Sequence, residues 1–397
     1  MKKIVLNYLV IVALAVGASL MSCNKDDDVI DDDISGITMT TAKDSVTFRI
    51  YALGTITLDW GDETAIDSLF VWGEKTFSHS YTNSDLHKIT LTGDEITSLY
   101  CADNQLTNLN TSAFSKLNSL HCSNNKLKSL DLSENTEIKI LECSYNLLMN
   151  IDLNNDTKLE SLICSYNQLD SLNINECTEL RYLEYYGQQY SNKLKSLDVR
   201  NNIKLIKLIC QNNQITSLDV SQHTQLTYLN CCLNKITSLD ISQSALLSTL
   251  DCNNNQLSNL DVSLNTQLTY LNCGANKIKS LDISQNTLLT SFHCSDNQLT
   301  SLDVSNNSKL THLGCDLNQL TSLDVSKNIM LLFLFCRNNQ LSSSALDALF
   351  DTLHNNDVID PTKNGEIGEK VITIEFNPGT SACNRNIATV KGWTFRK

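Results

Sequence analysis

Evenly spaced thiols are the residues of this sequence best placed to do chemistry. The chain has 397 residues and 15 cysteines, eleven of which recur in steps of 21 residues except for one gap of 46. They are Cys101, Cys122, Cys143, Cys164, Cys210, Cys231, Cys252, Cys273, Cys294, Cys315 and Cys336. Thiolates bind zinc and pair as disulfides, so the row could be a metal or disulfide array. Structural metal sites use clustered Cys-x-x-Cys pairs, which this sequence lacks. We therefore interpret each thiol as a small buried hydrophobic group and expect no metal and no cofactor.

The same spacing reveals an internal repeat. The gap of 46 residues equals two steps with a four-residue insertion, and Tyr185 stands where the missing cysteine would be. An asparagine follows each cysteine of the row by three residues, and Leu or Ile stands two and five residues before nearly every one. The twelve copies have the common string Leu-x-x-Leu-x-Cys-x-x-Asn-x-Leu-x-x-Leu-Asp-Val-Ser-x-Asn, from which single turns depart, as at Tyr185. A period of this length indicates a solenoid of stacked turns.

Physical chemistry explains why these turns must stack. The Leu-x-Cys alternation directs one face of a short strand inward. The apolar side chains of one turn cannot offset the entropy lost by ordering 21 residues, so stability depends on neighbouring turns. The repeated Asn is expected to bind backbone groups of adjacent turns. The Asp of Leu-Asp-Val-Ser is interpreted as a turn-stabilising residue, with a calcium-binding acidic ladder as the alternative.

This pattern resembles the leucine-rich repeat family, and more narrowly its internalin J type, which carries a cysteine ladder in a 21-residue repeat. The resemblance covers residues 96–341. It implies a parallel β-sheet on the concave face of a solenoid, with an irregular convex side. It also implies a role in protein binding or adhesion, without naming the ligand.

The N-terminus predicts export and a lipid anchor. Lys2 and Lys3 precede an apolar stretch that is too short for a membrane span, so residues 1–22 are predicted to be a signal peptide. Its last residues and Cys23 resemble the bacterial lipobox, in which the cysteine is lipidated; an ordinary signal peptide with a chance cysteine is the alternative. Residues 23–35 form an acidic tether that resembles the surface-export signal of Bacteroidetes lipoproteins. This resemblance implies a protein anchored by lipid to the bacterial outer membrane, at the cell surface.

Both ends of a solenoid need a cap. Residues 36–95 are predicted to form an N-terminal β-sandwich whose strands are Ser45–Tyr51, Thr55–Trp60, Ser68–Trp72 and His87–Gly93. Trp60-Gly61-Asp62 and His79-Ser80-Tyr81 resemble motifs of PKD-like domains. Asp62 is expected to cap a turn, while His79 and Tyr81 pack.

The C-terminal residues 342–397 are predicted to form a small α/β cap over the last turn. Ser342, Ser343 and Ser344 are good N-cap residues and precede a helical pattern of apolar residues. Val371–Phe376 alternates as a strand does.

Charge and missing motifs limit the possible functions. The formal net charge is −14, so the surface repels phosphate backbones and nucleic acid is not expected as a partner. The sequence has no His-Glu-x-x-His, Gly-x-Ser-x-Gly, phosphate loop or dinucleotide glycine motif. We therefore predict no catalytic residues and no enzyme.

Partner binding is predicted at the variable strand positions of the concave face. Tyrosine supplies a large rigid contact area and one hydroxyl, and it gathers near the single break in the repeat. The predicted partner-binding residues are Ile140, Tyr145, Ile163, Tyr166, Tyr182, Tyr186, Tyr190, Tyr228 and Tyr270. Scattered surface tyrosines without function are the alternative. The predicted function is protein binding or adhesion by a lipid-anchored surface protein. A structural subunit of an outer-membrane or periplasmic complex and a glycan-binding protein are the alternatives.

Overall fold

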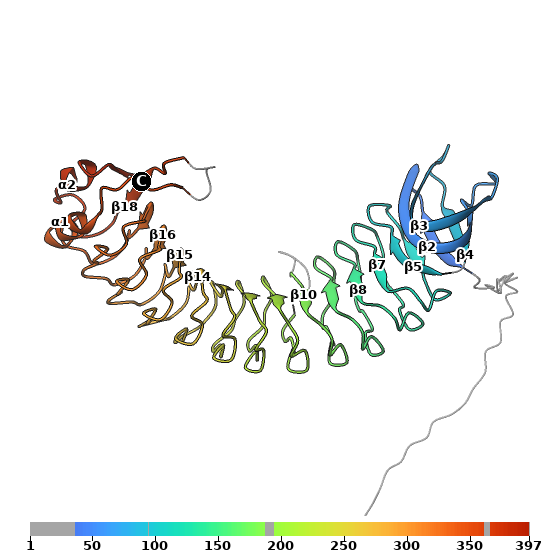
Figure 1. The fold of residues 1–397 in the computed structure, drawn as a ribbon, viewed down its shortest axis with the longest axis horizontal. Coiled ribbons are helices and arrows are strands. Elements are labelled where there is room, and N and C mark those ends of the chain that lie inside the picture. Colours follow the sequence, from blue (N-terminus) through green and yellow to red (C-terminus); the bar gives the residue numbers. More distant parts are fainter. Residues whose placement is uncertain (1–35, 94, 187–193, 361–365, 397) are drawn as a thin grey trace, which may run out of the picture. The chain divides into compact units, whose positions relative to one another are not determined.

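The computed structural model describes residues 36–93, 95–186, 194–360 and 366–396 (Figure 1). The predicted signal peptide, the lipidated Cys23, the acidic tether and Tyr190 lie outside the described residues. Within the described part of the chain, no helix is both long enough and apolar enough to cross a membrane.

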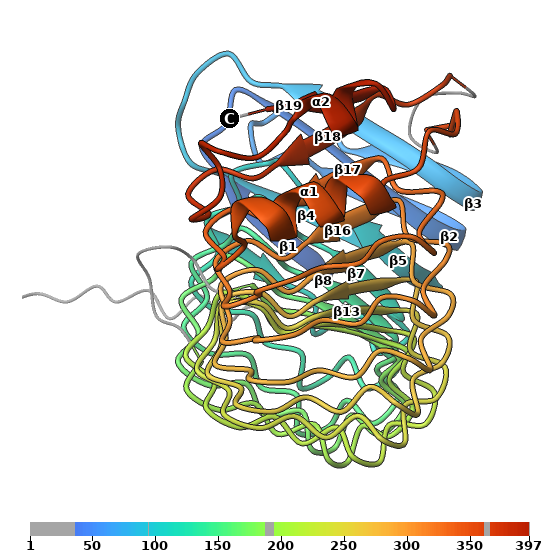
Figure 2. The same ribbon diagram turned by 90° about the vertical axis from the view of Figure 1, so that its left-hand side faces the viewer.

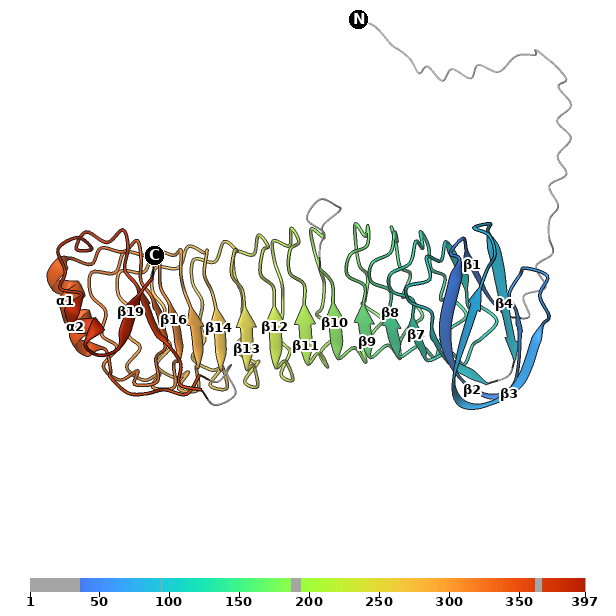
Figure 3. The same ribbon diagram turned by 90° about the horizontal axis from the view of Figure 1, so that it is seen from above.

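A parallel sheet built from very short strands organises the repeats. It begins at β5 (Ile96–Tyr100), and each later turn adds three residues that end just before the cysteine of that turn. The strands are β7 (Ser119–His121), β8 (Ile140–Glu142), β9 (Ser161–Ile163), β10 (Tyr182–Glu184), β11 (Lys207–Ile209), β12 (Tyr228–Asn230), β13 (Thr249–Asp251), β14 (Tyr270–Asn272), β15 (Ser291–His293), β16 (His312–Gly314) and β17 (Phe333–Phe335). The strands lie side by side in one row (Figure 3) and line the inner side of the stack (Figure 1). The predicted solenoid with a parallel sheet is confirmed.

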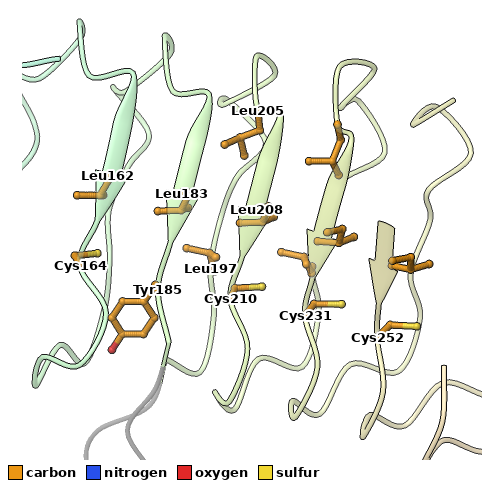
Figure 4. Close-up of a cluster of buried hydrophobic side chains, with 14 of the residues drawn as sticks. Leu162, Cys164, Leu183, Tyr185, Leu197, Leu205, Leu208, Cys210, Cys231 and Cys252 are labelled. Atoms are coloured by element: carbon orange, nitrogen blue, oxygen red, sulfur yellow. The ribbon is translucent and has the colours of Figure 1, made fainter. Parts of the chain in front are cut away.

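The stacking is in register from turn to turn. Leu229, Leu250 and Leu271 are direct partners in β12, β13 and β14. Seen along the stack, the turns superpose as nested loops (Figure 2). Tyr185 is fully buried in the position of the missing cysteine, between Cys164 and Cys210 (Figure 4). The irregular turn therefore keeps the register, as the spacing predicted.

The C-terminal segment extends the stack of parallel strands. The sequence had predicted only a small α/β cap over the last turn. The predicted helix is confirmed as α1 (Ser343–Thr352), and the Ser342 side chain accepts a hydrogen bond from Ala345 N–H. The predicted strand is shorter than expected, β18 (Lys370–Thr373), and it pairs in parallel with β17. After the short helix α2 (Asn386–Thr389), β19 (Trp393–Phe395) adds one more parallel strand. A capping role for this segment stays a prediction.

The N-terminal strands are also joined to the solenoid sheet. They are β1 (Ile37–Thr41), β2 (Ser45–Asp59), β3 (Asp67–Ser80), β4 (His87–Gly93) and, beyond β5, the short β6 (Asn108–Asn110). Two predicted strands are in fact the single strand β2, because Gly54, at φ 146°, continues the strand where we expected a break. One edge of β2 pairs with β3 along its length, and the other pairs with β4 and then with β5. The predicted PKD-like sandwich remains a prediction.

The expected local role of Asp62 is confirmed. Its carboxylate accepts hydrogen bonds from the N–H and hydroxyl of Thr64, and it lies 2.6 Å from His79 Nε2. These bonds, that of the Thr64 hydroxyl above all, lower the pKa of Asp62 to about 2. The His79 ring stacks on Trp60 with centroids 4.6 Å apart, and Tyr81 donates to the Trp60 carbonyl oxygen. The group stabilises the turn between β2 and β3.

The row of asparagines holds neighbouring turns together as expected. Asn255 Nδ2 donates to the carbonyl oxygens of Cys252 in its own turn and of Cys231 in the preceding turn. Its Oδ1 accepts the N–H of Ile236, 2.9 Å away. The same bonds recur down the stack, and each satisfies backbone groups that the short strands leave unpaired.

The thiols of the row pack in the core as small buried hydrophobic groups. All eleven are fully buried, and none of the cysteines in the described residues is in a disulfide. Burial raises the pKa of Cys122 to about 12, and the other ten are shifted in the same direction. A neutral, shielded thiol is a poor nucleophile.

We therefore expect iodoacetamide to leave the eleven thiols unmodified in the native protein and to alkylate all of them in denaturant. Peptide mass spectrometry would read out each site separately. Cys383, which is only partly buried, is the internal control for reagent activity. Rapid native labelling at Cys252 would contradict the packing described above.

Candidate functional site

The structure brings three of the predicted tyrosines into contact. The rings of Tyr145 and Tyr166 stack with centroids 4.3 Å apart and an interplanar angle of 15°. Tyr186 meets Tyr166 edge-on at 5.9 Å. Tyr145 is 51% exposed, while Leu147 and Met149 beside it along the chain are also exposed. We call Tyr145, Tyr166 and Tyr186 the tyrosine cluster; it offers a continuous aromatic surface across three turns.

The backbone beneath the cluster does not favour aromatic residues. Tyr145 and Tyr166 both have φ of 56°, in the left-handed region. Equivalent residues of other turns, among them Asn124, Asn212 and Asn254, have the same conformation. Asparagine adopts this conformation readily, whereas a bulky side chain does so at a cost. The backbone therefore does not account for tyrosine at these positions, although the fold also tolerates bulky side chains there in other turns.

Two hydroxyl groups of the cluster, those of Tyr145 and Tyr186, remain neutral at physiological pH. Burial is the largest cause that raises the pKa of Tyr186 to about 12, and the nearby Glu184 carboxylate adds to it. Tyr186 Oη donates to Glu184 at 3.4 Å. Burial also raises the pKa of Tyr145. The cluster thus presents neutral aromatic rings next to a carboxylate.

The remaining predicted residues form separate groups. Tyr182 and Tyr228 lie on either side of Lys207 in the sheet, and Thr249 separates Tyr228 from Tyr270. Lys207 Nζ lies 5.6 Å from the Tyr228 ring centroid. These tyrosines do not continue the cluster.

The two predicted isoleucines are less available than an apolar patch requires. Ile140 is 37% exposed. Ile163 is half-buried and lies between Glu142 and Glu184 in the sheet. Both isoleucines lie on the strands of the parallel sheet, but Ile163 has a glutamate on each side. Tyr190 lies outside the described residues.

Acidic residues of the convex side stabilise turns. Asp261 accepts a hydrogen bond from the N–H of Ser263, and Asp282 binds Ser284 in the same way. The Ser263 hydroxyl contributes most to lowering the pKa of Asp261. Over the described residues, no three His, Cys, Asp or Glu side chains come together as a metal site would require.

One polar group on the concave face escaped the sequence prediction. Ser119 Oγ lies 2.8 Å from His121 Nε2, and His121 Nδ1 lies 2.8 Å from a carboxylate oxygen of Glu142. Ser119 and His121 share one face of β7, and Glu142 is the direct neighbour of His121 in β8. The sequence contained a pattern that could have revealed this group: Ser119 and His121 are two residues apart on a predicted strand, and Glu142 occupies the position of His121 in the next repeat.

Comparisons with known proteins agree with this architecture. No protein-family model matches the chain. No curated protein matches it either. Among solved structures, the functional domain of InlJ from Listeria monocytogenes, which includes a cysteine ladder, is 30% identical; the alignment covers 74% of this chain and 77% of that one, with a TM-score of 0.49.

Two further solved structures resemble the chain more closely in shape. A leucine-rich repeat protein of Leptospira interrogans is 22% identical over 75% of this chain and 83% of that one, with a TM-score of 0.57. A plant peptide hormone receptor in complex with RGF2 is 21% identical over 72% of this chain and 48% of that one, with a TM-score of 0.54. Together with the register, the buried cysteines and the asparagine row, these likenesses show that the chain is a solenoid with the leucine-rich repeat fold.

Proposed function

We propose that this protein binds another protein or a peptide through the tyrosine cluster on its concave side. The observation that carries the proposal is the partly exposed, stacked pair Tyr145–Tyr166, whose rings lie 4.3 Å apart across neighbouring turns. Rigid, partly exposed aromatic rings are typical of residues that dominate binding energy. The plant receptor of the same fold, solved in complex with RGF2, supports a peptide or protein ligand.

Replacing Tyr145 and Tyr166 by asparagine tests the proposal without damaging the fold. Asparagine suits the left-handed backbone, so the double variant should unfold at the same or a higher urea concentration than the parent. Binding to a partner captured by the parent from extracts should weaken about tenfold or more, because each aromatic anchor contributes about 1–2 kcal/mol. Surface plasmon resonance would measure the change.

A matched variant makes the result specific. Leu233 and Leu317 are exposed residues with the same left-handed backbone in distant turns. Their replacement by asparagine should leave the affinity unchanged. If both double variants bind like the parent, the tyrosine cluster is not the binding site. Loss of binding to a glycan array, with protein binding intact, would instead favour the glycan-binding alternative.

We further propose that the chain is displayed by a lipid on Cys23 at the surface of a bacterial outer membrane. The lipobox-like residues before Cys23 and the acidic residues after it support this location. In intact cells, added protease should digest the protein, and Cys23→Ala should abolish its labelling by palmitate. Protection from protease until the outer membrane is opened would favour the periplasmic subunit instead.

A further inference from the structure

The hydrogen-bond roles of Ser119, His121 and Glu142 follow from their chemistry. An ionised carboxylate can only accept, so the proton between His121 and Glu142 belongs to His121 Nδ1. In a neutral imidazole the other nitrogen is then an acceptor. In this tautomer the Ser119 hydroxyl donates to His121 Nε2, across 2.8 Å. The His121 hydrogen bond lowers the pKa of Glu142, which keeps it ionised.

This arrangement is that of a nucleophile, its general base and a group that orients the base. The orientation is reinforced from the other side, because the Tyr100 ring stacks on His121 with centroids 4.3 Å apart and an interplanar angle of 13°. The Arg49 guanidinium lies over the same Tyr100 ring, 4.2 Å from its centroid. His121 is therefore fixed between an aromatic ring and a carboxylate.

We infer that Ser119 is an activated nucleophile that accepts the acyl group of a short-chain carboxylic ester. Ser119 Oγ forms the new bond to the acyl carbon, and its proton passes to His121 Nε2. The bond from the acyl carbon to the leaving oxygen breaks, and that oxygen takes the proton from His121. Water then hydrolyses the acyl-serine by the same route. Ser119 is only 5% exposed, so access to its Oγ is restricted and only a small ester could bring its acyl carbon within reach.

The chain contains a natural control for this inference. Ser291 and His293 occupy the same strand positions in β15, with the same contact of 2.9 Å. The residue that corresponds to Glu142 there is Gly314, which pairs with His293 in the neighbouring strand. His293 therefore has no carboxylate at that position to fix its proton on Nδ1. Only the first of the two groups has the complete arrangement.

The inference departs from the sequence-based expectation that the chain is not an enzyme. That expectation rested on the absence of catalytic motifs along the chain. Equivalent positions can still differ in one neighbour, and here a single carboxylate distinguishes them. The inference is independent of the tyrosine cluster, because acylation of Ser119 does not require ligand binding by the cluster, and ligand binding does not require acylation.

The test uses the full chain and a fluorophosphonate probe, which forms an oxygen–phosphorus bond to an activated serine and releases fluoride. Peptide mass spectrometry should find the label on Ser119 and not on Ser291. Labelling should fall about a hundredfold in His121→Ala and about tenfold in Glu142→Gln. Hydrolysis of p-nitrophenyl acetate should follow the same order.

Folding controls keep these outcomes interpretable. Urea unfolding of Glu142→Gln should match that of the parent, because the amide oxygen can still accept a hydrogen bond from His121 Nδ1–H. Equal labelling of Ser119 and Ser291, or absence of label on both while a known serine hydrolase reacts, would overturn the inference. So would labelling of Ser119 that Glu142→Gln leaves unchanged at every pH.

Discussion

Replacing Asn255 by leucine is expected to lower the free energy of unfolding by about 2–5 kcal/mol, because the N–H of Ile236 loses its acceptor and two carbonyl oxygens each lose one donor inside the core. A buried donor without a partner carries a desolvation penalty that apolar contacts do not remove. Urea unfolding followed by circular dichroism would measure the effect. Hydrogen exchange would show the loss spreading to neighbouring turns, since each turn depends on contacts with the next.

A matched asparagine controls for the change of residue type. Asn259 lies in the same turn but is exposed. Asn259→Leu should change the free energy of unfolding by no more than about 0.5 kcal/mol. Equal effects of the two substitutions would mean that the asparagine row does not stabilise the stack.

Replacing Asp156 by asparagine is expected to stabilise the protein by about 1–3 kcal/mol at neutral pH. Asp156 occupies a second row of inward-facing polar residues, in which Asn265 donates to the carbonyl oxygens of Ile241 and Ser244 in the preceding turn. An ionised carboxylate has no proton to donate there, and Asp156 Oδ1 has no hydrogen-bond partner. The amide of asparagine would supply the missing donor.

The pH dependence gives this prediction its sign. Burial raises the pKa of Asp156 from 3.8 to about 6, so the folded chain holds this proton more tightly than the unfolded chain. The stabilisation from the protonated form is complete below the unfolded pKa and is lost as the pH rises through about 6. The advantage of Asp156→Asn should therefore be largest above pH 6 and should shrink as the pH falls toward 4.

The reverse substitution provides the control. Asn265→Asp places a carboxylate at an equivalent position and should destabilise the chain near neutral pH by a similar amount. Thermal unfolding of both variants between pH 4 and pH 7 would show opposite trends. If Asp156→Asn leaves the free energy of unfolding unchanged at pH 7, the proposed lack of a hydrogen-bond donor at Asp156 is wrong, and water or another group hydrogen-bonds to its carboxylate in solution.

The repeats could be predicted because one local pattern is copied many times. Each turn places Leu, Cys and Asn at fixed steps, so an assignment made for Cys252 holds for its equivalents. The same logic placed Tyr185 in the core, although it is the largest departure from the pattern. A further member of the asparagine row, Asn377, was missed because Ile374 stands in place of cysteine. Asn377, three residues later, nevertheless binds the Cys336 and Ile374 carbonyl oxygens as the other members do.

The candidate site was only partly predictable, since it depends on contacts between turns. Sequence position placed Tyr145 and Tyr166 in equivalent sites of neighbouring turns, which is why their proximity could be expected. It could not show that Tyr186 joins them while Tyr182 does not, because that depends on side-chain direction. The relation of Ser119 to Glu142 crosses two strands, and a search for motifs along the chain does not detect it.

The junctions at the two ends of the row use the same bonds as its interior. Asn104 Oδ1 accepts the N–H of Thr47 in β2, and Asn377 Oδ1 accepts the N–H groups of Asn339 and Leu341. The hydrogen bonds at the two junctions do not depend on how many turns lie between them. Duplication or deletion of one whole repeat in the gene would therefore lengthen or shorten the protein while keeping both junctions, so the length of the solenoid can evolve in whole-turn steps.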